Sequence, residues 1–321
     1  MIVDLPDTTT SKISKALVRI REDGGAVALG RVLTLVIATT LGQEEEAIEA
    51  ANDASREHPM RVIVISTAAQ DATPTGVEGR LDAQIRVGGD AGASDVIVLR
   101  AYGDTASDEE GLVTGLLLPD APVVAWWPGT APEVASKSPL GRIATRRITD
   151  ASTQSDPHEA LRHLAATYAP GDTDFAWTRL TLWRAQLAAV LDQPPFEPIT
   201  AVEVAGAADS PSTVLLAAWL RLQLKVPVQH DLTRSTGSTG IHGVRLSRES
   251  GVIELEREIP NVATLVQPNQ PTHDLSLPRR NLRDCLAEEL RRLDPDVLYG
   301  EVITSGLDQL EDDEQGAGHT V

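Results

Sequence analysis

The first half of the chain alternates between two hydrophobic patterns, one typical of helices and one of buried strands. Residues 13–20 carry apolar side chains at helical spacing, and residues 43–56 begin with glutamates and end near a proline, as helices do. Short, nearly continuous apolar runs predict strands that are covered on both faces. Strands of this kind that alternate with helices indicate a parallel sheet with crossover helices. The expected strands lie at residues 31–38, 61–66, 83–87, 95–101 and 122–127, and further helices lie at 108–117 and 157–168.

The segment Ala169-Pro170-Gly171-Asp172 breaks regular structure and predicts a domain boundary. After it, Ser210 and Pro211 mark the start of an apolar helix, because serine caps helices and proline fits their first turn. Alternating apolar residues on either side of Ser250-Gly251 predict a β-hairpin. Other helices are expected at residues 174–191, 279–293 and 294–306, and strands at 199–204, 226–230, 241–248, 252–259 and 263–267.

These elements predict the α/β class, with two α/β domains built on largely parallel sheets. The second domain carries an antiparallel hairpin extension. We expect an N-terminal domain over residues 1–170 and a C-terminal domain, with the hairpin and the C-terminal helices, over residues 171–307. Residues 308–321 are acidic and poor in apolar side chains, so they are expected to form a disordered tail.

Composition restricts the partners of the chain. Its 321 residues include 28 Lys+Arg and 47 Asp+Glu, which give a formal net charge of -19. Such an anion is repelled by nucleic-acid phosphates and by anionic membrane surfaces, so neither is an expected partner. The N-terminus lacks the features of a signal peptide, and no apolar run approaches the ~20 residues of a membrane span. We therefore expect a cytoplasmic protein, whose self-association the sequence leaves open.

The sequence carries no standard catalytic motif. The sequence has no Walker loop, no Gly-x-Ser-x-Gly elbow and no Gly-x-Gly-x-x-Gly fingerprint after its first predicted strand. His158 and His163 are five residues apart, which places them on different faces of a helix, unlike the histidine pair of a zinc helix. The pair His230-Asp231 resembles a base with its orienting partner, but no nucleophile accompanies it. We expect no catalytic residue, no metal and no cofactor.

Two segments place large aromatic or charged side chains where a partner could meet them. Trp126 and Trp127 lie on opposite faces at the end of a predicted strand, so one is expected in the core and the other in the core, in a crevice or at a partner surface. In the predicted helix 174–191, Trp183 belongs to the apolar stripe and Arg184 lies inside it. A charge in that position needs an internal salt bridge or a carboxylate from a partner.

A Gly- and Ser-rich segment follows the predicted strand 226–230. It contains Arg234, Ser235, Thr236 and His242, whose donors could hold an anion as a backbone nest does. Such a tract is also typical of a connector. Both interpretations stay open.

Several segments of the chain have distinctive amino-acid sequences. They are residues 17–25, PVVAWWP (122–128), FAWTRLTLWR (175–184), LPRR (277–280) and LAEELRRLDPDVLYG (286–300). In this order they resemble the OpcA family of glucose-6-phosphate dehydrogenase assembly proteins, most of all its actinobacterial form. The resemblance covers nearly the whole chain up to about residue 305.

The resemblance implies a non-catalytic protein that binds glucose-6-phosphate dehydrogenase, promotes its active oligomer and raises its activity. Such a protein would support the oxidative pentose phosphate pathway. Cyanobacterial relatives are associated with thioredoxin-dependent redox control. Here Cys285 is the only thiol and is expected in the core, so an internal dithiol switch is impossible.

Under this interpretation the partner-binding residues are tryptophans and arginines from the segments above, with a rim of further arginines. The alternative function is a sugar-phosphate-binding enzyme or a metabolite sensor, with the rim arginines and the 234–242 segment holding the anion. The expected partner-binding residues are Trp126, Trp127, Arg142, Arg146, Arg147, Arg179, Trp183 and Arg184.

Overall fold

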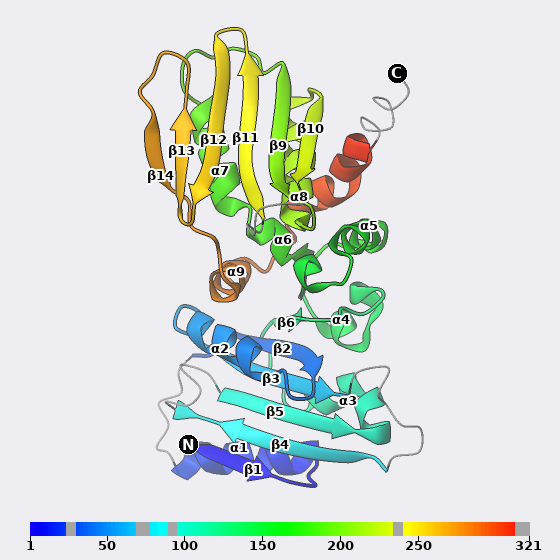
Figure 1. Ribbon diagram of the computed structural model, residues 1–321. Helices are drawn as coiled ribbons and strands as arrows, with labels where there is room; N and C mark the ends of the chain where they lie inside the picture. Colours follow the sequence, from blue (N-terminus) through cyan, green and yellow to red (C-terminus); the bar gives the residue numbers. More distant parts are fainter. Residues whose placement is uncertain (24–29, 69–77, 89–94, 234–239, 312–321) are drawn as a thin grey trace. The chain divides into compact units, whose positions relative to one another are not determined.

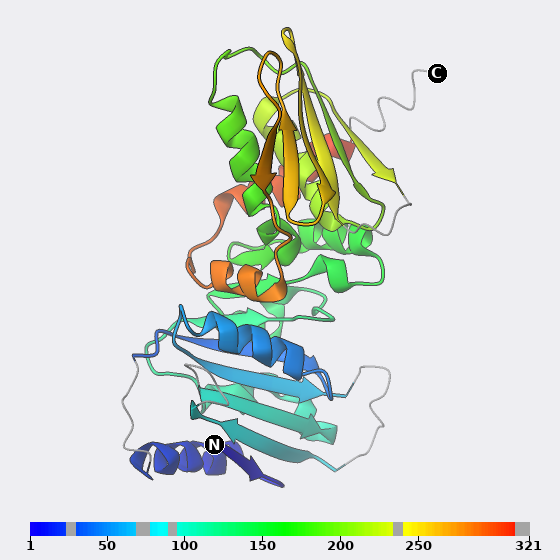
Figure 2. The same cartoon turned by 60° about the vertical axis from the view of Figure 1, so that its left-hand side comes forward.

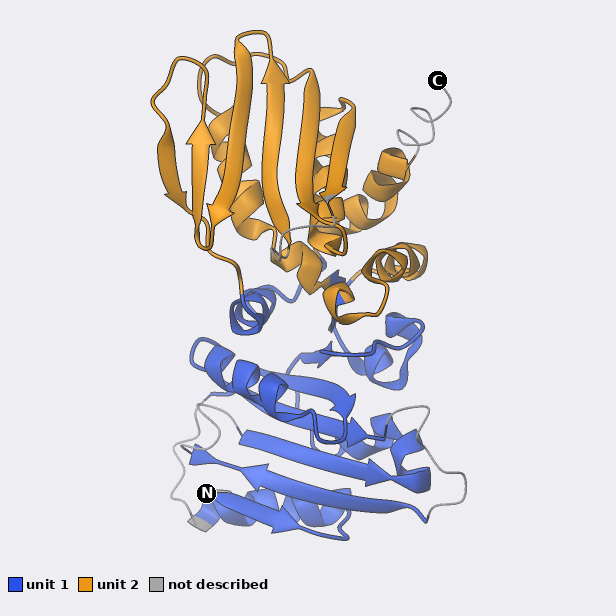
Figure 3. Ribbon diagram, viewed as in Figure 1, with its two compact units in different colours: residues 1–150, 171–173, 281–295 blue, residues 151–170, 174–280, 296–321 orange. Residues whose placement is uncertain are grey.

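A computed structural model describes residues 1–23, 30–68, 78–88, 95–233 and 240–311 of the chain (Figure 1). They form two compact units, coloured in Figure 3. Unit 1 comprises residues 1–150, 171–173 and 281–295, and unit 2 comprises residues 151–170, 174–280 and those from 296 onward. Each unit therefore takes segments from both sides of the predicted boundary at Pro170. A division into separately folding domains at that residue stays a prediction.

Unit 1 is built on an eight-stranded sheet with the order β1-β4-β5-β3-β2-β6-β7-β8. The central strands β5, β3, β2, β6 and β7 are parallel, and β4 and β1 extend the sheet in antiparallel pairing. The strands are β1 (Ile2–Leu5), β2 (Leu33–Thr40), β3 (Met60–Thr67), β4 (Arg80–Arg86), β5 (Asp95–Tyr102), β6 (Val123–Trp126), β7 (Arg146–Thr149) and β8 (Asp172–Asp174), and the helices are α1 (Thr10–Asp23), α2 (Glu45–Ala54), α3 (Glu109–Thr114), α4 (Pro139–Ile143) and α9 (Leu282–Glu289).

The core of unit 1 follows the predicted pattern. β3 is buried from Met60 through Ser66, as expected of a strand covered on both faces. Helix α9 begins at the N-cap Asn281, whose side chain accepts from the backbone N–H of Asp284. It packs on α2, and its Cys285 is fully buried, which confirms the expected core position.

Unit 2 is built on a six-stranded sheet with the order β10-β9-β11-β12-β13-β14, called sheet B here. Only β9 and β10 are parallel among its described pairs, so the antiparallel extension is larger than the predicted hairpin. The strands are β9 (Ala201–Ala207), β10 (Val228–Thr233), β11 (Ile241–Arg248), β12 (Gly251–Ile259), β13 (Val262–Val266) and β14 (His273–Ser276), and the helices are α5 (Pro157–Thr167), α6 (Phe175–Thr178), α7 (Thr181–Leu191), α8 (Pro211–Leu224) and α10 (Val297–Glu301), followed by the π-helical turn η6 (Val302–Gly306).

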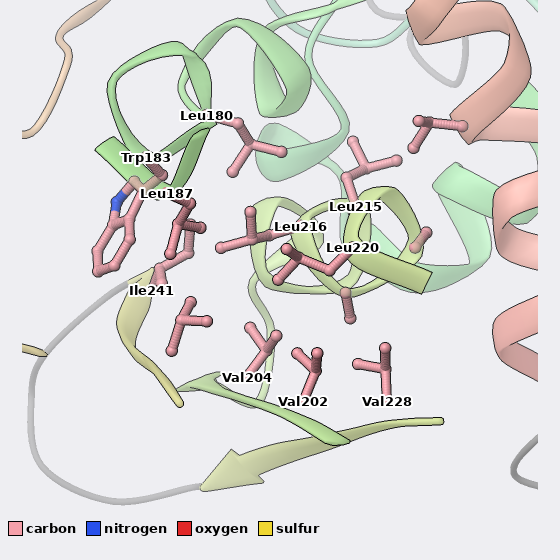
Figure 4. Packing of buried hydrophobic residues seen from close by; sticks show 14 of the residues in the cluster. Leu180, Trp183, Leu187, Val202, Val204, Leu215, Leu216, Leu220, Val228 and Ile241 are labelled. Atoms are coloured by element: carbon pink, nitrogen blue, oxygen red, sulfur yellow. The ribbon is translucent and has the colours of Figure 1, made fainter. Parts of the chain in front are cut away.

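Helices α7 and α8 cover one face of sheet B. Figure 4 shows Val202 and Val204 of β9 directed toward Leu216 of α8, and Figure 2 shows the green α7 beside the sheet from a second direction. We call this the inner face of sheet B and the opposite one the outer face. The start of α8 confirms the predicted cap, because the Ser210 hydroxyl accepts from the backbone N–H of Thr213 at 3.2 Å.

The mixed α/β class is thereby confirmed. The elements β1, α4, β7, β8 and β14 were not expected from the sequence, and among the expected segments two differ clearly. The predicted helix 174–191 is interrupted between α6 and α7, because the Thr178 carbonyl accepts from Arg280 and from the Thr181 hydroxyl, both at 3.0 Å. Residues 308–311, expected in the tail, are helical, and Leu310 is buried in the core of unit 2. The rest of the predicted tail lies outside the described residues.

Candidate functional site

The segment FAWTRLTLWR folds around Trp177 in unit 2. The Trp177 indole is 1% exposed and donates to the Asp296 carboxylate at 2.8 Å. Asp296 also accepts from the backbone N–H of Tyr299 and caps α10. The rings of Trp177 and Tyr299 lie 5.9 Å apart, and Tyr168 meets Tyr299 edge-on at 6.0 Å. This aromatic cluster therefore joins the segment 175–184 to the end of the segment 286–300.

Arg184 lies against this cluster. Its guanidinium stacks on the Trp177 ring at 3.7 Å from the ring centre and donates to the Thr181 hydroxyl at 3.3 Å. The charge inside the apolar stripe thus meets an aromatic face, which attracts a cation through its quadrupole. The carboxylate expected beside Arg184, either internal or from a partner, stays a prediction.

Trp183 is a core residue of unit 2. It is 2% exposed, and the Arg257 guanidinium lies 5.3 Å from its ring. Burial, with a smaller contribution from the charge of Arg279, lowers the pKa of Arg257 to about 10, so this cation stays protonated at neutral pH. In the structure described here, Trp183 therefore presents almost no surface to a partner.

Arg146 and Arg147 lie side by side on β7 and form buried ion pairs within unit 1. Arg146 pairs with Glu289 of α9 and donates to the Asp294 carbonyl at 2.8 Å. Arg147 pairs with Asp172 and donates to the Ala144 carbonyl. Both arginines are less than a tenth exposed, so neither lies on an exposed rim. Arg146 thus connects β7 to α9, and Arg147 connects β7 to β8.

The remaining predicted arginines keep exposed surface. Arg142 pairs with Glu110 at 2.9 Å, and both side chains are substantially exposed. Arg179 is half-buried and donates to the Ser152 hydroxyl. Trp126 and Trp127, by contrast, are 0% and 4% exposed on and just after β6. The predicted partner-binding residues are thus distributed over both units, and their contact with a partner stays a prediction.

The predicted anion segment is described in part. Arg234, Ser235 and Thr236 lie outside the described residues. His242 lies on β11 and lines a depression of about 440 Å³ on sheet B, together with Arg245 and Glu203. Within the described ranges, no cluster of three or more histidine, cysteine or acidic side chains is arranged to hold a metal ion. The described helices include none with the length and apolarity of a membrane span.

Two family descriptions match this chain in sequence order. Residues 51–166 match the N-terminal domain, and residues 170–303 the C-terminal domain, of the family described as "Glucose-6-phosphate dehydrogenase subunit". Both descriptions carry the name OpcA, and together they span most of the chain. The chain belongs to the OpcA family. The resemblance seen in the sequence is thereby confirmed, and the actinobacterial form stays a prediction.

A curated relative from Synechocystis sp. (strain ATCC 27184 / PCC 6803 / Kazusa), named "Putative OxPP cycle protein OpcA", is 26% identical over 151 residues. This match covers 45% of the chain and 31% of the relative, so the chain spans less than half of that protein's length.

Among solved structures, an oxidoreductase from Sinorhizobium meliloti has a TM-score of 0.51 at 10% identity, over 89% of this chain and 98% of that one. An inositol dehydrogenase homolog from Azotobacter vinelandii has a TM-score of 0.44 at 11% identity, over 91% and 97%. The first likeness shows a shared fold alone.

One group of charged residues has no continuous signal in the sequence. Glu203, Arg245, Glu254 and Glu256 come from three strands and meet on the outer face of sheet B. Each lies at a polar position of a strand that alternates polar and buried residues, which was the available signal. Their proximity depends on the strand order, which the sequence leaves open.

Proposed function

We propose that this OpcA-family chain is a non-catalytic assembly factor that binds glucose-6-phosphate dehydrogenase, promotes its active oligomer and raises its activity. A binding protein changes the activity of an enzyme only if it has a higher affinity for the active conformation than for the inactive one. We infer that this differential affinity is the mechanism of activation. Activation of the dehydrogenase in this way would support the oxidative pentose phosphate pathway.

The observation that carries the proposal is the match of both halves of the chain, residues 51–166 and 170–303, to domains described as parts of a glucose-6-phosphate dehydrogenase subunit. Among the described contacts of the family-like segments, the stacking of Arg184 on Trp177 places a cation on an aromatic face and sets no nucleophile beside a base.

The test is a rate assay of purified dehydrogenase with and without the chain, alongside a mass measurement of the mixture. We expect a higher rate and a larger complex when the chain is present. An unchanged rate and an unchanged mass distribution would refute the proposal. Calorimetry of the chain alone with glucose 6-phosphate, 6-phosphogluconate and NADPH tests the alternative, because tight binding of one of them without the dehydrogenase would favour a sugar-phosphate enzyme or a metabolite sensor.

A further inference from the structure

The outer face of sheet B carries a row of charged side chains across adjacent strands. Glu203 on β9 lies directly opposite Arg245 on β11, which in turn lies opposite Glu254 on β12. Because residues in register share a face of the sheet, all three project away from the side on which α7 and α8 pack. Their side chains are 45%, 47% and 34% exposed, respectively.

This row has more negative than positive charge. The Arg245 guanidinium lies 3.9 Å from Glu203, 3.2 Å from Glu254 and 3.1 Å from Glu256, so one cation serves three carboxylates. Strand register places two more carboxylates, Asp231 and Asp274, on the same face. These six charged groups together carry a net charge of −4. The surplus carboxylates are available to cations from outside the chain.

Apolar side chains border the charged row on the same face. Val262 and Val266 of β13 are each 37% exposed, and Val252 of β12 is 41% exposed. Val266 lies in register with Glu254, which places it beside the charged row. The exposed valines of β12 and β13, together with a depression of about 440 Å³ on the same sheet, give a partner both apolar area and a shaped surface.

The charge of this face selects among possible occupants. A second copy of the chain would place one net negative face against another, and like-charge contact opposes association. The whole chain carries a formal net charge of -19, which adds to that repulsion at longer range. A protein surface that presents lysines or arginines is attracted by the same charges. The outer face therefore suits a basic partner surface.

We propose that the outer face of sheet B is the docking surface of this chain, and that it binds a lysine- or arginine-rich patch of glucose-6-phosphate dehydrogenase. This inference rests on the proposed function for the identity of the partner. In the complex, basic side chains of the dehydrogenase pair with Glu203, Glu254 and Glu256, and apolar side chains cover Val262 and Val266. Arg245 holds the three glutamates in place and limits their mutual repulsion.

The test compares two variants with the same change of net charge. In the first, Glu203→Gln, Glu254→Gln and Glu256→Gln are combined. In the control, three exposed glutamates of unit 1 are replaced by glutamine at positions 22, 46 and 49. Circular dichroism and thermal unfolding establish that both variants fold. The dissociation constant for purified dehydrogenase is then measured at low and at physiological salt, together with the mass of the chain alone.

We expect the first variant to bind about tenfold more weakly or worse at low salt, because attraction across an interface is lost. Its affinity should depend less on salt than that of the natural chain, since fewer charges remain to be screened. The control should bind within about twofold of the natural chain.

Equal binding by the first variant and the natural chain would overturn the docking surface and leave the proposed function intact. No binding by the natural chain itself would overturn both. A mass that shows a dimer of the natural chain and a monomer of the first variant would assign the outer face to self-association and also overturn the proposal. Two variants of the apolar part, Val262→Ser and Val266→Ser, should weaken binding without changing its salt dependence.

Discussion

Replacement of Glu289 by alanine tests whether buried charge pairing holds α9 in unit 1. Glu289 and Arg146 are 6% and 4% exposed, so the change leaves a guanidinium in the interior without its carboxylate. Removal of one partner from a buried ion pair costs about 3–5 kcal/mol. Arg146 keeps its hydrogen bond to the Asp294 carbonyl at 2.8 Å, so we expect the lower end of that range.

The assay combines urea unfolding with hydrogen exchange measured along the chain. The free energy of unfolding should fall by about 3 kcal/mol, and amides of α9 should exchange roughly a hundredfold faster if the helix detaches locally. The matched control is Glu110→Ala, which breaks the exposed pair with Arg142. Exposed pairs contribute less than about 1 kcal/mol, so this variant should remain close to the natural chain.

A double variant separates the ion pair from simple loss of packing. With Arg146→Met and Glu289→Leu together, no buried charge is left without a partner, and apolar side chains fill much of the same space. The double variant should therefore lose less stability than Glu289→Ala alone. The reasoning about this pair is wrong if the double variant loses as much stability as Arg146→Met and Glu289→Leu lose singly when their losses are added, or more. It is also wrong if Glu289→Ala behaves like the exposed control.

Three further predictions concern unit 2. Gly206→Ala should lower the free energy of unfolding by about 1–3 kcal/mol, because a Cβ there would lie 2.1 Å from the buried Thr213 hydroxyl. Thermal unfolding measures this loss, and the combination with Thr213→Ala should recover part of it. Arg184→Gln should cost about 0.5–2 kcal/mol through loss of the cation–π contact, and a double-mutant cycle with Trp177→Leu should show the coupling. Burial lowers the pKa of His158 below 6.5. The stability that the neutral imidazole contributes is therefore complete above pH 6.5 and is lost as the pH falls through the pKa of the folded state. Urea midpoints measured between pH 7 and pH 4.5 should fall less steeply in His158→Gln than in the natural chain.

Most elements of both sheets were predictable because their signals are local. The cap Ser210 and the alternation of β11 and β12 depend on residues within a few positions of one another. The interruption between α6 and α7 has no such signal. It depends on Arg280, which is 102 residues away from Thr178 in the chain. Apolar periodicity continues across that interruption, so the sequence indicates one helix where the tertiary contact produces two.

The burial of Arg146 and Arg147 was also not predictable from nearby residues, because it depends on partners elsewhere in the chain. Arg146 and Arg147 stand together in a charged segment, which is typical of an exposed surface. Their carboxylate partners lie 143 and 25 residues away, and these pairs allow both cations to be buried on an inner strand. A charge that has a distant partner cannot be distinguished in the sequence from a charge that meets solvent.

The segments that reveal the family and the surface proposed for docking carry different kinds of information. Trp177, Arg280 and Asp296 belong to family-like segments, and each makes contacts that hold unit 2 together. The amino-acid sequences of these segments are distinctive because a packed aromatic cluster with specific hydrogen bonds tolerates few other residues at its positions. An exposed row such as Glu203, Arg245 and Glu254 is defined by strand register and not by a continuous segment. The family could therefore be inferred from the sequence, whereas the docking surface could be proposed only after the strands were placed side by side.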